Sequence, residues 1–287
     1  MNKSVVGKKD FKAERMAPGM AAVGAYAKDY PIDPYLIFSE FWMSAPVFGP
    51  HPHAGISVMT YMRPDSQDSL INRDDLTGLS VIEPGGLHIM QAGSGMHHDE
   101  FPRTEGVEAR GFQIWFNHAA KDRLVAPKSV HVDPRDVPEV REKHVRVRVV
   151  HGRYAGTSTP YKMITDVDLL HVYLEPESEV RIAAREMAFV YGLEGSGSTE
   201  GAEILPQTMV TYSTEGDDVV VAAGKTGLEF LFASGTPTNE PIVYGGPFVA
   251  TTVEQLRDMQ RRHALGEMGT LEPYDGSGQA EASTGVF

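Results

Sequence analysis

The chain has no cysteine among its 287 residues. This absence excludes a disulfide framework, a thiolate metal site and a cysteine nucleophile, and it fits a reducing compartment. No apolar stretch approaches the roughly 20 residues that a membrane-spanning helix needs. Lysines lie near the start of the chain, but no apolar segment follows them, so we expect no secretory signal. We therefore predict a globular protein of the cytoplasm that does not contact a membrane.

Basic residues are too few to offset the acidic ones, and the formal net charge is −13. Binding to nucleic acid depends on clustered Lys and Arg side chains that contact phosphates. The one short basic run, from Arg141 to Arg148, alternates with valine and is interpreted as the solvated face of a strand. We expect no direct binding of nucleic acid.

Short segments rich in β-forming residues make up most of the chain. Ile56 to Met62 and Gly111 to Asn117 have this character, and Glu83 to Gly86 is predicted to form a tight turn between two others. Because such segments recur at intervals of about 8–12 residues between Pro and Gly corners, they indicate an all-β barrel or sandwich.

A stretch rich in proline and charge, Pro127 to Glu142, is predicted to be a linker. It divides the chain into an N-terminal domain of residues 1–135 and a C-terminal domain of residues 136–287. Six strands are predicted in the second domain, over Val145–Val150, Leu169–Leu174, Met187–Tyr191, Met209–Tyr212, Val219–Ala222 and Leu228–Ala233.

The end of the chain departs from this β pattern. Thr251 with Glu254 three residues later forms a capping-box pattern, and the apolar spacing that follows predicts a helix from Val253 to about Leu265. Beyond Gly269 the composition is rich in Gly, Ser, Ala and Glu, which predicts a disordered tail.

Two short histidine motifs in the first half indicate a metal site. Residues two apart in a strand point to the same face, so His51 and His53 share one face, as do His98 and Glu100 on a second strand. Two such strands inside a barrel would offer three imidazoles and a carboxylate to one point. These donors suit a first-row transition metal that keeps open positions for a substrate or dioxygen.

Other arrangements of these polar residues are open at this stage. The four side chains can instead line a barrel mouth, bonded only to one another and to water. His88 is a rival ligand, His97 is expected outside the site or at its rim, and Asp99 is expected to be solvated. Four histidines outside the two motifs are interpreted as surface or structural residues: His118, His131, His144 and His263. The second half has no such paired motif and is predicted to bind no metal.

Neighbouring residues are candidates for supporting roles. Ligating imidazoles and carboxylates usually hydrogen-bond to further side chains that orient them, and Gln113 and Asn117 lie on a nearby predicted strand. Four apolar side chains are interpreted either as pocket lining or as ordinary core: Phe41, Trp42, Met59 and Phe112.

Several motifs together resemble the pirin family of bicupins. They are His51-Pro52-His53 with Gly55, the corner Ala92 to Gly95, His98-x-Glu100-x-Pro102, and the strand Gly111 to Asn117. The stretch Pro241 to Val249 is similar to the C-terminal signature of the family.

The resemblance implies two cupin-type β-barrels (double-stranded β-helices) followed by a short helix, with a metal only in the N-terminal barrel. It implies iron held by His51, His53, His98 and Glu100, with Mn, Co, Ni, Cu or Zn as alternatives. It further implies quercetin 2,3-dioxygenase activity on a small aromatic substrate. For such a reaction we hypothesise that Glu100 takes the hydroxyl proton as the catalytic base. A metal-containing regulatory protein that acts through a partner protein, and a dioxygenase for a different small substrate, are the alternatives.

The chain departs from the family pattern at four places that we expect near the pocket mouth. These are Phe38 to Trp42, Ala54, Ser57-Val58 and Met62 to Asp65. We therefore expect the metal ligands, but not the identity of the substrate, to carry over from the family.

Overall fold

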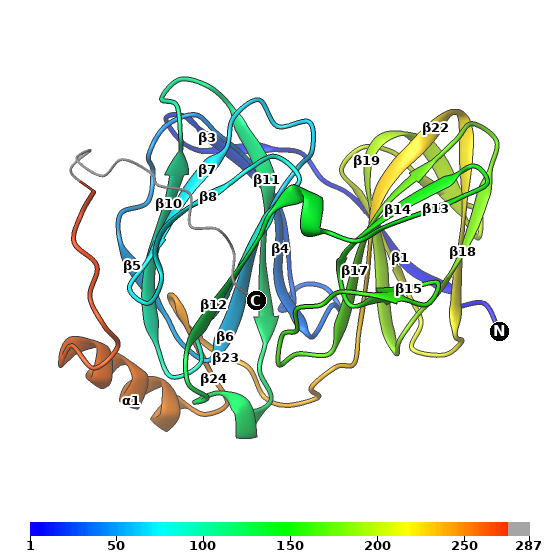
Figure 1. Cartoon of the computed structure of the whole chain (residues 1–287). Helices are drawn as coiled ribbons and strands as arrows, with labels where there is room; N and C mark the ends of the chain where they lie inside the picture. Colours follow the sequence, from blue (N-terminus) through cyan, green and yellow to red (C-terminus); the bar gives the residue numbers. More distant parts are fainter. Residues whose placement is uncertain (275–287) are drawn as a thin grey trace.

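The computed structural model describes residues 1–274, which form two β-barrels side by side and one C-terminal helix (Figure 1). The strands of the first barrel are β2 Glu14–Ala17, β3 Met20–Tyr26, β4 Tyr35–Met43, β5 His51–His53, β6 Ile56–Met62, β7 Leu70–Asp74, β8 Gly78–Ile82, β9 Leu87–Gln91, β10 Met96–Pro102, β11 Ala109–Asn117 and β12 Lys128–Val132. They form a seven-stranded sheet in the order β12-β9-β6-β11-β4-β3-β2 and a four-stranded sheet in the order β5-β10-β7-β8.

The second barrel is built on one nine-stranded sheet. Its strands are β1 Val5–Asp10, β13 Glu139–Glu142, β14 Val145–His151, β17 Val167–Leu174, β18 Glu179–Ala183, β19 Met187–Thr199, β20 Ala202–Ile204, β21 Thr208–Tyr212 and β22 Asp218–Gly235. The main path is β1-β21-β19-β22-β17-β14-β13, with β18 paired to β22 and β20 paired to β19. The remaining elements are the hairpins β15 Arg153–Tyr154 with β16 Thr157–Ser158 and β23 Val243–Gly245 with β24 Phe248–Ala250, the helix α1 Val253–Ala264, and two 3-10 helices, η1 Ala120–Asp122 and η2 Pro134–Asp136.

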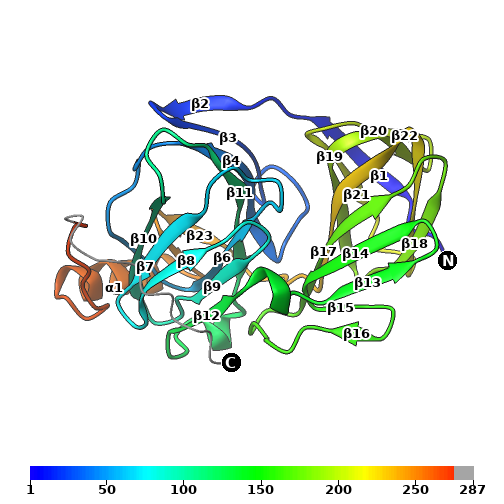
Figure 2. The same ribbon diagram turned by 45° about the horizontal axis from the view of Figure 1, so that its top comes forward.

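Both ends of the chain cross between the barrels. Strand β1 pairs with β21 in the second barrel, and the chain then passes to β2 in the first barrel (Figure 2). At the other end, β24 and α1 lie against the first barrel, where Ala54 forms a bridge with Phe248 and packs with Met259. The boundary at residue 135 stays a prediction.

The largest apolar cluster lies between the barrels rather than inside either one. Phe38 of the first barrel packs there against Phe189 of the second, with ring centroids 5.1 Å apart. Phe112 of the first barrel packs against Phe38, with ring centroids 5.3 Å apart. Because side chains alternate along a strand, the opposite face of β4 and β11 points into the first barrel. This alternation leaves Ser39, Gln113 and Trp115 inside the first barrel.

The predicted all-β architecture and the C-terminal helix are confirmed. The predicted linker contains the passage from the first barrel to the second, but much of it is strand. Within Pro127 to Glu142, β12 pairs with β9 of the first barrel and β13 pairs with β14 of the second. The basic run Arg141 to Arg148 is therefore a hairpin and not one strand. A short segment flanked by prolines can form a strand when a neighbouring strand supplies the hydrogen bonds.

Two further details differ from the prediction. The segments Val219–Ala222 and Leu228–Ala233 belong to one strand, β22, whose two ends pair with β18 and β17. The residue that caps α1 is Thr252, whose hydroxyl accepts a hydrogen bond from the Gln255 amide, and not Thr251. The predicted disordered tail lies largely outside the described residues.

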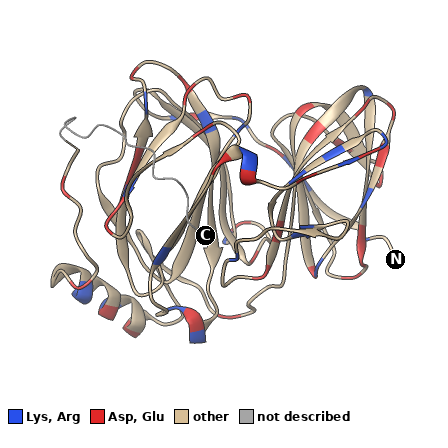
Figure 3. Cartoon of the chain, in the orientation of Figure 1, with Lys and Arg blue, Asp and Glu red and all other residues tan. Residues whose placement is uncertain are grey.

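Acidic and basic residues are scattered over both barrels and α1 (Figure 3). Among residues 1–274, the structure contains no helix with the length and apolar character needed to cross a membrane.

Candidate metal site

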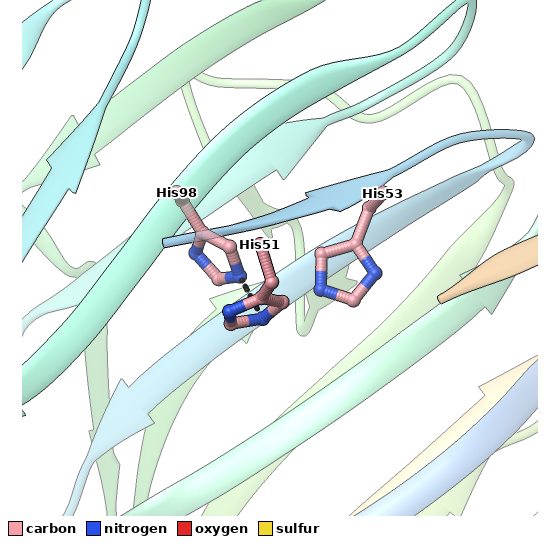
Figure 4. A group of neighbouring side chains, drawn as sticks. All are labelled: His51, His53 and His98. Atoms are coloured by element: carbon pink, nitrogen blue, oxygen red, sulfur yellow. Dashed lines mark hydrogen bonds between the residues drawn. The ribbon is translucent and has the colours of Figure 1, made fainter. Parts of the chain in front are cut away.

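The two histidine motifs lie on paired strands of the small sheet. Strand β5 runs antiparallel to β10, with His51 opposite His98 and His53 opposite Met96. His51, His53 and His98 therefore share one face, and their rings gather at one point inside the first barrel (Figure 4). The prediction that His51 and His53 lie on one face, together with His98 of the second strand, is confirmed.

The three imidazoles are close enough to share an ion. One nitrogen from each ring lies within 4.8 Å of the other two. The Nε2 atoms of His51 and His98 are 3.1 Å apart. His53 and His98 are each only 2% exposed, while His51 is half-buried at the cavity wall. No other such group was found among residues 1–274.

The backbone orients two of these rings. The Nδ1 atom of His51 lies 2.9 Å from the Gly49 carbonyl oxygen, and that of His53 lies 3.2 Å from the Pro247 carbonyl oxygen. An Nδ1–H that donates to a carbonyl leaves the Nε2 lone pair available, which is the usual arrangement of a metal-binding histidine. The Nε2 atom of His53 is buried and has no hydrogen-bond partner among the described residues. The donor set therefore fits a metal ion.

The electrostatics keep the imidazoles neutral. Burial, together with the nearby His51, lowers the pKa of His53 to about 3. Burial also lowers the pKa of His51 and places that of His98 well below its ordinary value. A neutral imidazole is the form that binds a metal.

Glu100 lies two residues beyond His98 on β10 and lines the same cavity as His51 and His53. Its carboxylate accepts a hydrogen bond of 2.9 Å from Gln113 Nε2. Burial raises the pKa of Glu100, and hydrogen bonds from Thr60 and Gln113 oppose the rise. Glu100 does not belong to the group of atoms within 4.8 Å of one another, so its role as a ligand stays a prediction.

The cavity beside the histidines has a volume of about 300 Å³. Its wall is mainly apolar and comes from several strands and loops: Met20, Ser39, Phe41, Met43, Phe48, His51, His53, Leu70, Glu100, Gln113, Trp115 and Pro247. Trp115 contacts His53 edge to face, with ring centroids 4.8 Å apart. Apolar walls with a few convergent polar groups are typical of small-molecule sites.

Of the four apolar residues considered as pocket lining, only Phe41 lines this cavity. Met59 and Phe112 belong to the cluster between the barrels, and Trp42 packs against that cluster. Their strands have two buried faces, so hydrophobicity alone does not tell which face meets the pocket. The alternation along β11 would have identified Trp115, because it is two residues from Gln113.

The other polar residues considered near the site have structural partners. His88 is buried, with Nε2 3.3 Å from Asp74 Oδ2, and lies outside the histidine group. His97 points to the opposite face, where the C-terminal segment covers it and its Nδ1 lies 3.1 Å from the Met268 carbonyl oxygen. Asp99 was expected to be solvated, but it is 2% exposed and is paired with Arg73 at 2.9 Å.

Two further expectations about the surroundings need correction. Asn117 hydrogen-bonds Asp33 and Thr238, and not a ligand. Of the departures expected at the pocket mouth, Ser39 and Phe41 do line the cavity. Ala54 instead packs beneath β24, and Arg63 lies between the barrels.

Comparisons with known proteins agree with this architecture. The profile of the Pirin family matches residues 29–116, and that of the pirin C-terminal cupin domain matches residues 169–269. A pirin-like protein of Arabidopsis thaliana is 31% identical over 305 residues, which cover 100% of this chain and 97% of the relative. A Pseudomonas aeruginosa protein provisionally named quercetin 2,3-dioxygenase is 31% identical over 82% of this chain and 86% of its own length. The crystal structure of quercetin 2,3-dioxygenase from Acinetobacter baumannii has a TM-score of 0.85 at 22% identity and covers 95% of this chain and 100% of its own.

The fold and the site together define a bicupin, in which the first of two cupin-type barrels carries a group of three histidines suited to a metal ion. The chain belongs to the pirin family.

Proposed function

We propose that this pirin is a cytoplasmic, iron-dependent dioxygenase that acts on a flavonol such as quercetin. The observation that carries the proposal is the buried, unpartnered Nε2 of His53, which faces two further neutral imidazoles at the wall of an apolar cavity. The relative from Pseudomonas aeruginosa supports the choice of reaction. The lack of cysteine supports the reducing compartment.

In this proposal His51, His53, His98 and Glu100 hold the metal. Three neutral nitrogens and one carboxylate suit divalent iron, and they also suit Mn, Co, Ni, Cu or Zn. When bound, such an ion supplies Lewis acidity and, in the case of iron, redox chemistry with dioxygen.

The protein's own residues prepare the substrate. Glu100 takes the proton of the reacting hydroxyl, which is a general-base role. Gln113 holds that carboxylate through its amide. Trp115 and Phe41 offer apolar surfaces for flat rings and limit the access of water.

The test is dioxygen uptake by protein loaded with divalent iron, with quercetin as substrate under reducing conditions. We expect uptake that depends on both iron and quercetin. A Glu100→Gln variant that retains its metal should turn over on the order of 10²–10⁴ times more slowly, the usual loss when a general base is removed. Full turnover in this variant would remove the base role. No uptake by the loaded wild type would reject the flavonol dioxygenase in favour of another substrate or a partner protein.

A further inference from the structure

A second cavity of about 380 Å³ adjoins the one at the histidines. The two cavities share four lining residues, which are Met20, Ser39, Gln113 and Trp115. We propose that the second cavity is a distal substrate subsite. It would hold the far ring of an elongated aromatic substrate whose reacting ring lies at the histidines. The inference rests on the proposed function and specifies its substrate class as molecules of two linked aromatic units with hydroxyl groups on the far unit.

A straight row of residues across three strands connects the two cavities. Gln113 on β11 is opposite Ser39 on β4, and Ser39 is opposite Gly24 on β3. The amide of Gln113 donates to Glu100 in the first cavity, while Gly24 lines the second. A substrate that lies along this row would therefore reach from the carboxylate to β3.

The floor of the second cavity is built of small residues. Ala22, Gly24 and Ser39 lie on the same face of neighbouring strands and line the cavity. Since Gly24 has no Cβ, a flat ring can approach the backbone closely at this point. The indole of Trp115 offers an aromatic surface at the junction of the two cavities. This shape favours a planar aromatic group.

The exposure of the shared residues shows that the inner face of the sheet is not filled by core side chains. Strands β4 and β11 are interior strands of a seven-stranded sheet, and Phe38 and Phe112 on their outer face are fully buried. Ser39, Gln113 and Trp115 on the inner face are only half-buried. Protein interiors are close-packed, so half-buried side chains at the centre of a sheet indicate space kept for a ligand.

The rim of the second cavity supplies polar groups. Phe11 and Lys12 line it from the segment before β2, and Glu14 and Met16 line it from β2 itself. An ammonium group and a carboxylate can respectively donate to and accept from phenolic hydroxyls. Alone, the first cavity is at the lower limit of ligand pockets, roughly 300–1,000 Å³. The two together offer room for a substrate of several rings.

Gly24 provides a variant that fills the second cavity without touching the histidines. A Cβ built on Gly24 has its nearest neighbours at 3.4 Å, in Ser39, which is ordinary van der Waals contact, and its φ lies outside the left-handed region. Gly24→Leu therefore suits the backbone and places a larger side chain in the cavity. Gly24→Ala is the matched control.

The experiment is anaerobic calorimetric titration of metal-loaded protein with quercetin and with 3-hydroxychromone, which lacks the far ring. We expect Gly24→Leu to weaken quercetin binding at least about tenfold and to leave the binding of 3-hydroxychromone and the metal content unchanged. Gly24→Ala should behave like the wild type. Unchanged quercetin affinity in Gly24→Leu would overturn the subsite. If the wild type binds neither compound, the proposed function itself fails.

The rim gives a second test that does not disturb the sheet. The double variant Lys12→Met, Glu14→Gln changes only side chains at the edge of the cavity. The wild type should prefer quercetin to 3,5,7-trihydroxyflavone, which differs only in that its far ring carries no hydroxyl, and the double variant should lose most of that preference. An unchanged preference would overturn the assignment of the far ring to this cavity.

Discussion

The ring of His53 is held in place by its Nδ1 contact and by the packing of Trp115. The Pro247 carbonyl lies at Nδ1, Trp115 packs against the ring, and Nε2 faces the other two imidazoles. The carboxylate of Glu100 is likewise held, in this case by the amide of Gln113. At the scale of single residues, we therefore expect the proposed metal site to depend on the residues that orient its ligands as well as on the ligands themselves.

Replacing the amide of Gln113 tests this dependence. Gln113→Leu keeps the volume but removes the donor to Glu100, and we expect metal affinity to fall about 10–100-fold. Equilibrium competition with a chelator measures the change. Gln91→Leu is the control, because Gln91 is a buried amide of the same barrel that bonds the Ala126 carbonyl instead. Equal losses in both variants would indicate a general effect on the barrel.

The alternation of side chains along a strand explains which site residues could be predicted from the sequence. The spacing of two residues is enough to place His51 and His53 on one face of their strand, because it needs no knowledge of the rest of the fold. That His98 lies opposite His51 depends on the pairing of β10 with β5, which is distant in sequence. The same rule could not place Met59 or Phe112. Both faces of their sheet are buried, one by the site and the other by the second barrel. The sequence does not tell which of these two faces a given side chain occupies.

At the scale of elements, the C-terminal segment completes the first barrel. The backbone of β24 passes directly over Gly55, where the Val249 carbonyl oxygen would lie 1.9 Å from a Cβ. Pro247, which precedes Val249 by two residues, supplies the carbonyl that orients His53. Gly55 has a φ of +80°, so it is both a left-handed turn and a point of close approach.

Gly55→Ala should therefore destabilise the fold by more than the strain of its left-handed backbone conformation alone. Gly78 has a similar φ of +78° in the same barrel, but a Cβ there meets nothing within 4 Å. We expect Gly55→Ala to lower the free energy of unfolding by about 1–3 kcal/mol more than Gly78→Ala, the usual cost of forcing atoms into a packed region. Urea unfolding of both variants measures this difference. Equal losses would show that β24 moves aside freely.

The elements that were mispredicted share a cause. The segment of β12 contains too little apolar periodicity to predict a strand, and its partner β9 is distant in sequence. Likewise, the two halves of β22 are separate apolar runs, and they belong to one strand that pairs with β19 at both halves. The position of helix α1 was predicted correctly because its apolar periodicity is local, although its cap lies one residue later than predicted.

At the scale of the whole molecule, the two barrels form one body around a shared apolar cluster. Polar contacts cross the same interface, where the Tyr61 hydroxyl lies 2.8 Å from His171 Nδ1 and His171 Nε2 lies 2.8 Å from Glu229. Burial lowers the pKa of His171, as it does for His151 in the second barrel and His118 in the first. The metal-free molecule therefore carries neutral, buried imidazoles in both barrels.

These imidazoles should make the fold sensitive to acid, and His118 allows a quantitative test. Burial lowers its pKa from 6.5 to about 4. Below pH 6.5 the unfolded chain takes up a proton at His118 while the folded chain does not, so stability falls with pH through this window. Between pH 6.5 and 5 the loss is about 2 kcal/mol, at roughly 1.4 kcal/mol per pKa unit.

The variant His118→Gln cannot titrate in this range and isolates the contribution. We expect the free energy of unfolding of the wild type, relative to this variant, to decline by about 2 kcal/mol when the pH is lowered from 7.5 to 5. Urea unfolding of the metal-free proteins at the two pH values provides the measurement. A relative stability that does not change with pH would show that His118 is already charged in the folded state, or is accessible to water.

The central claim is that His51, His53 and His98, with Glu100, hold one metal ion. The most direct measurement is the metal content of protein purified without added metal, determined by elemental analysis for the wild type, His53→Ala and His88→Ala. We predict about one iron per chain in the wild type, a similar content in His88→Ala, and loss of the metal in His53→Ala. Wild-type protein that binds no transition metal, or metal that persists in His53→Ala, would contradict the account.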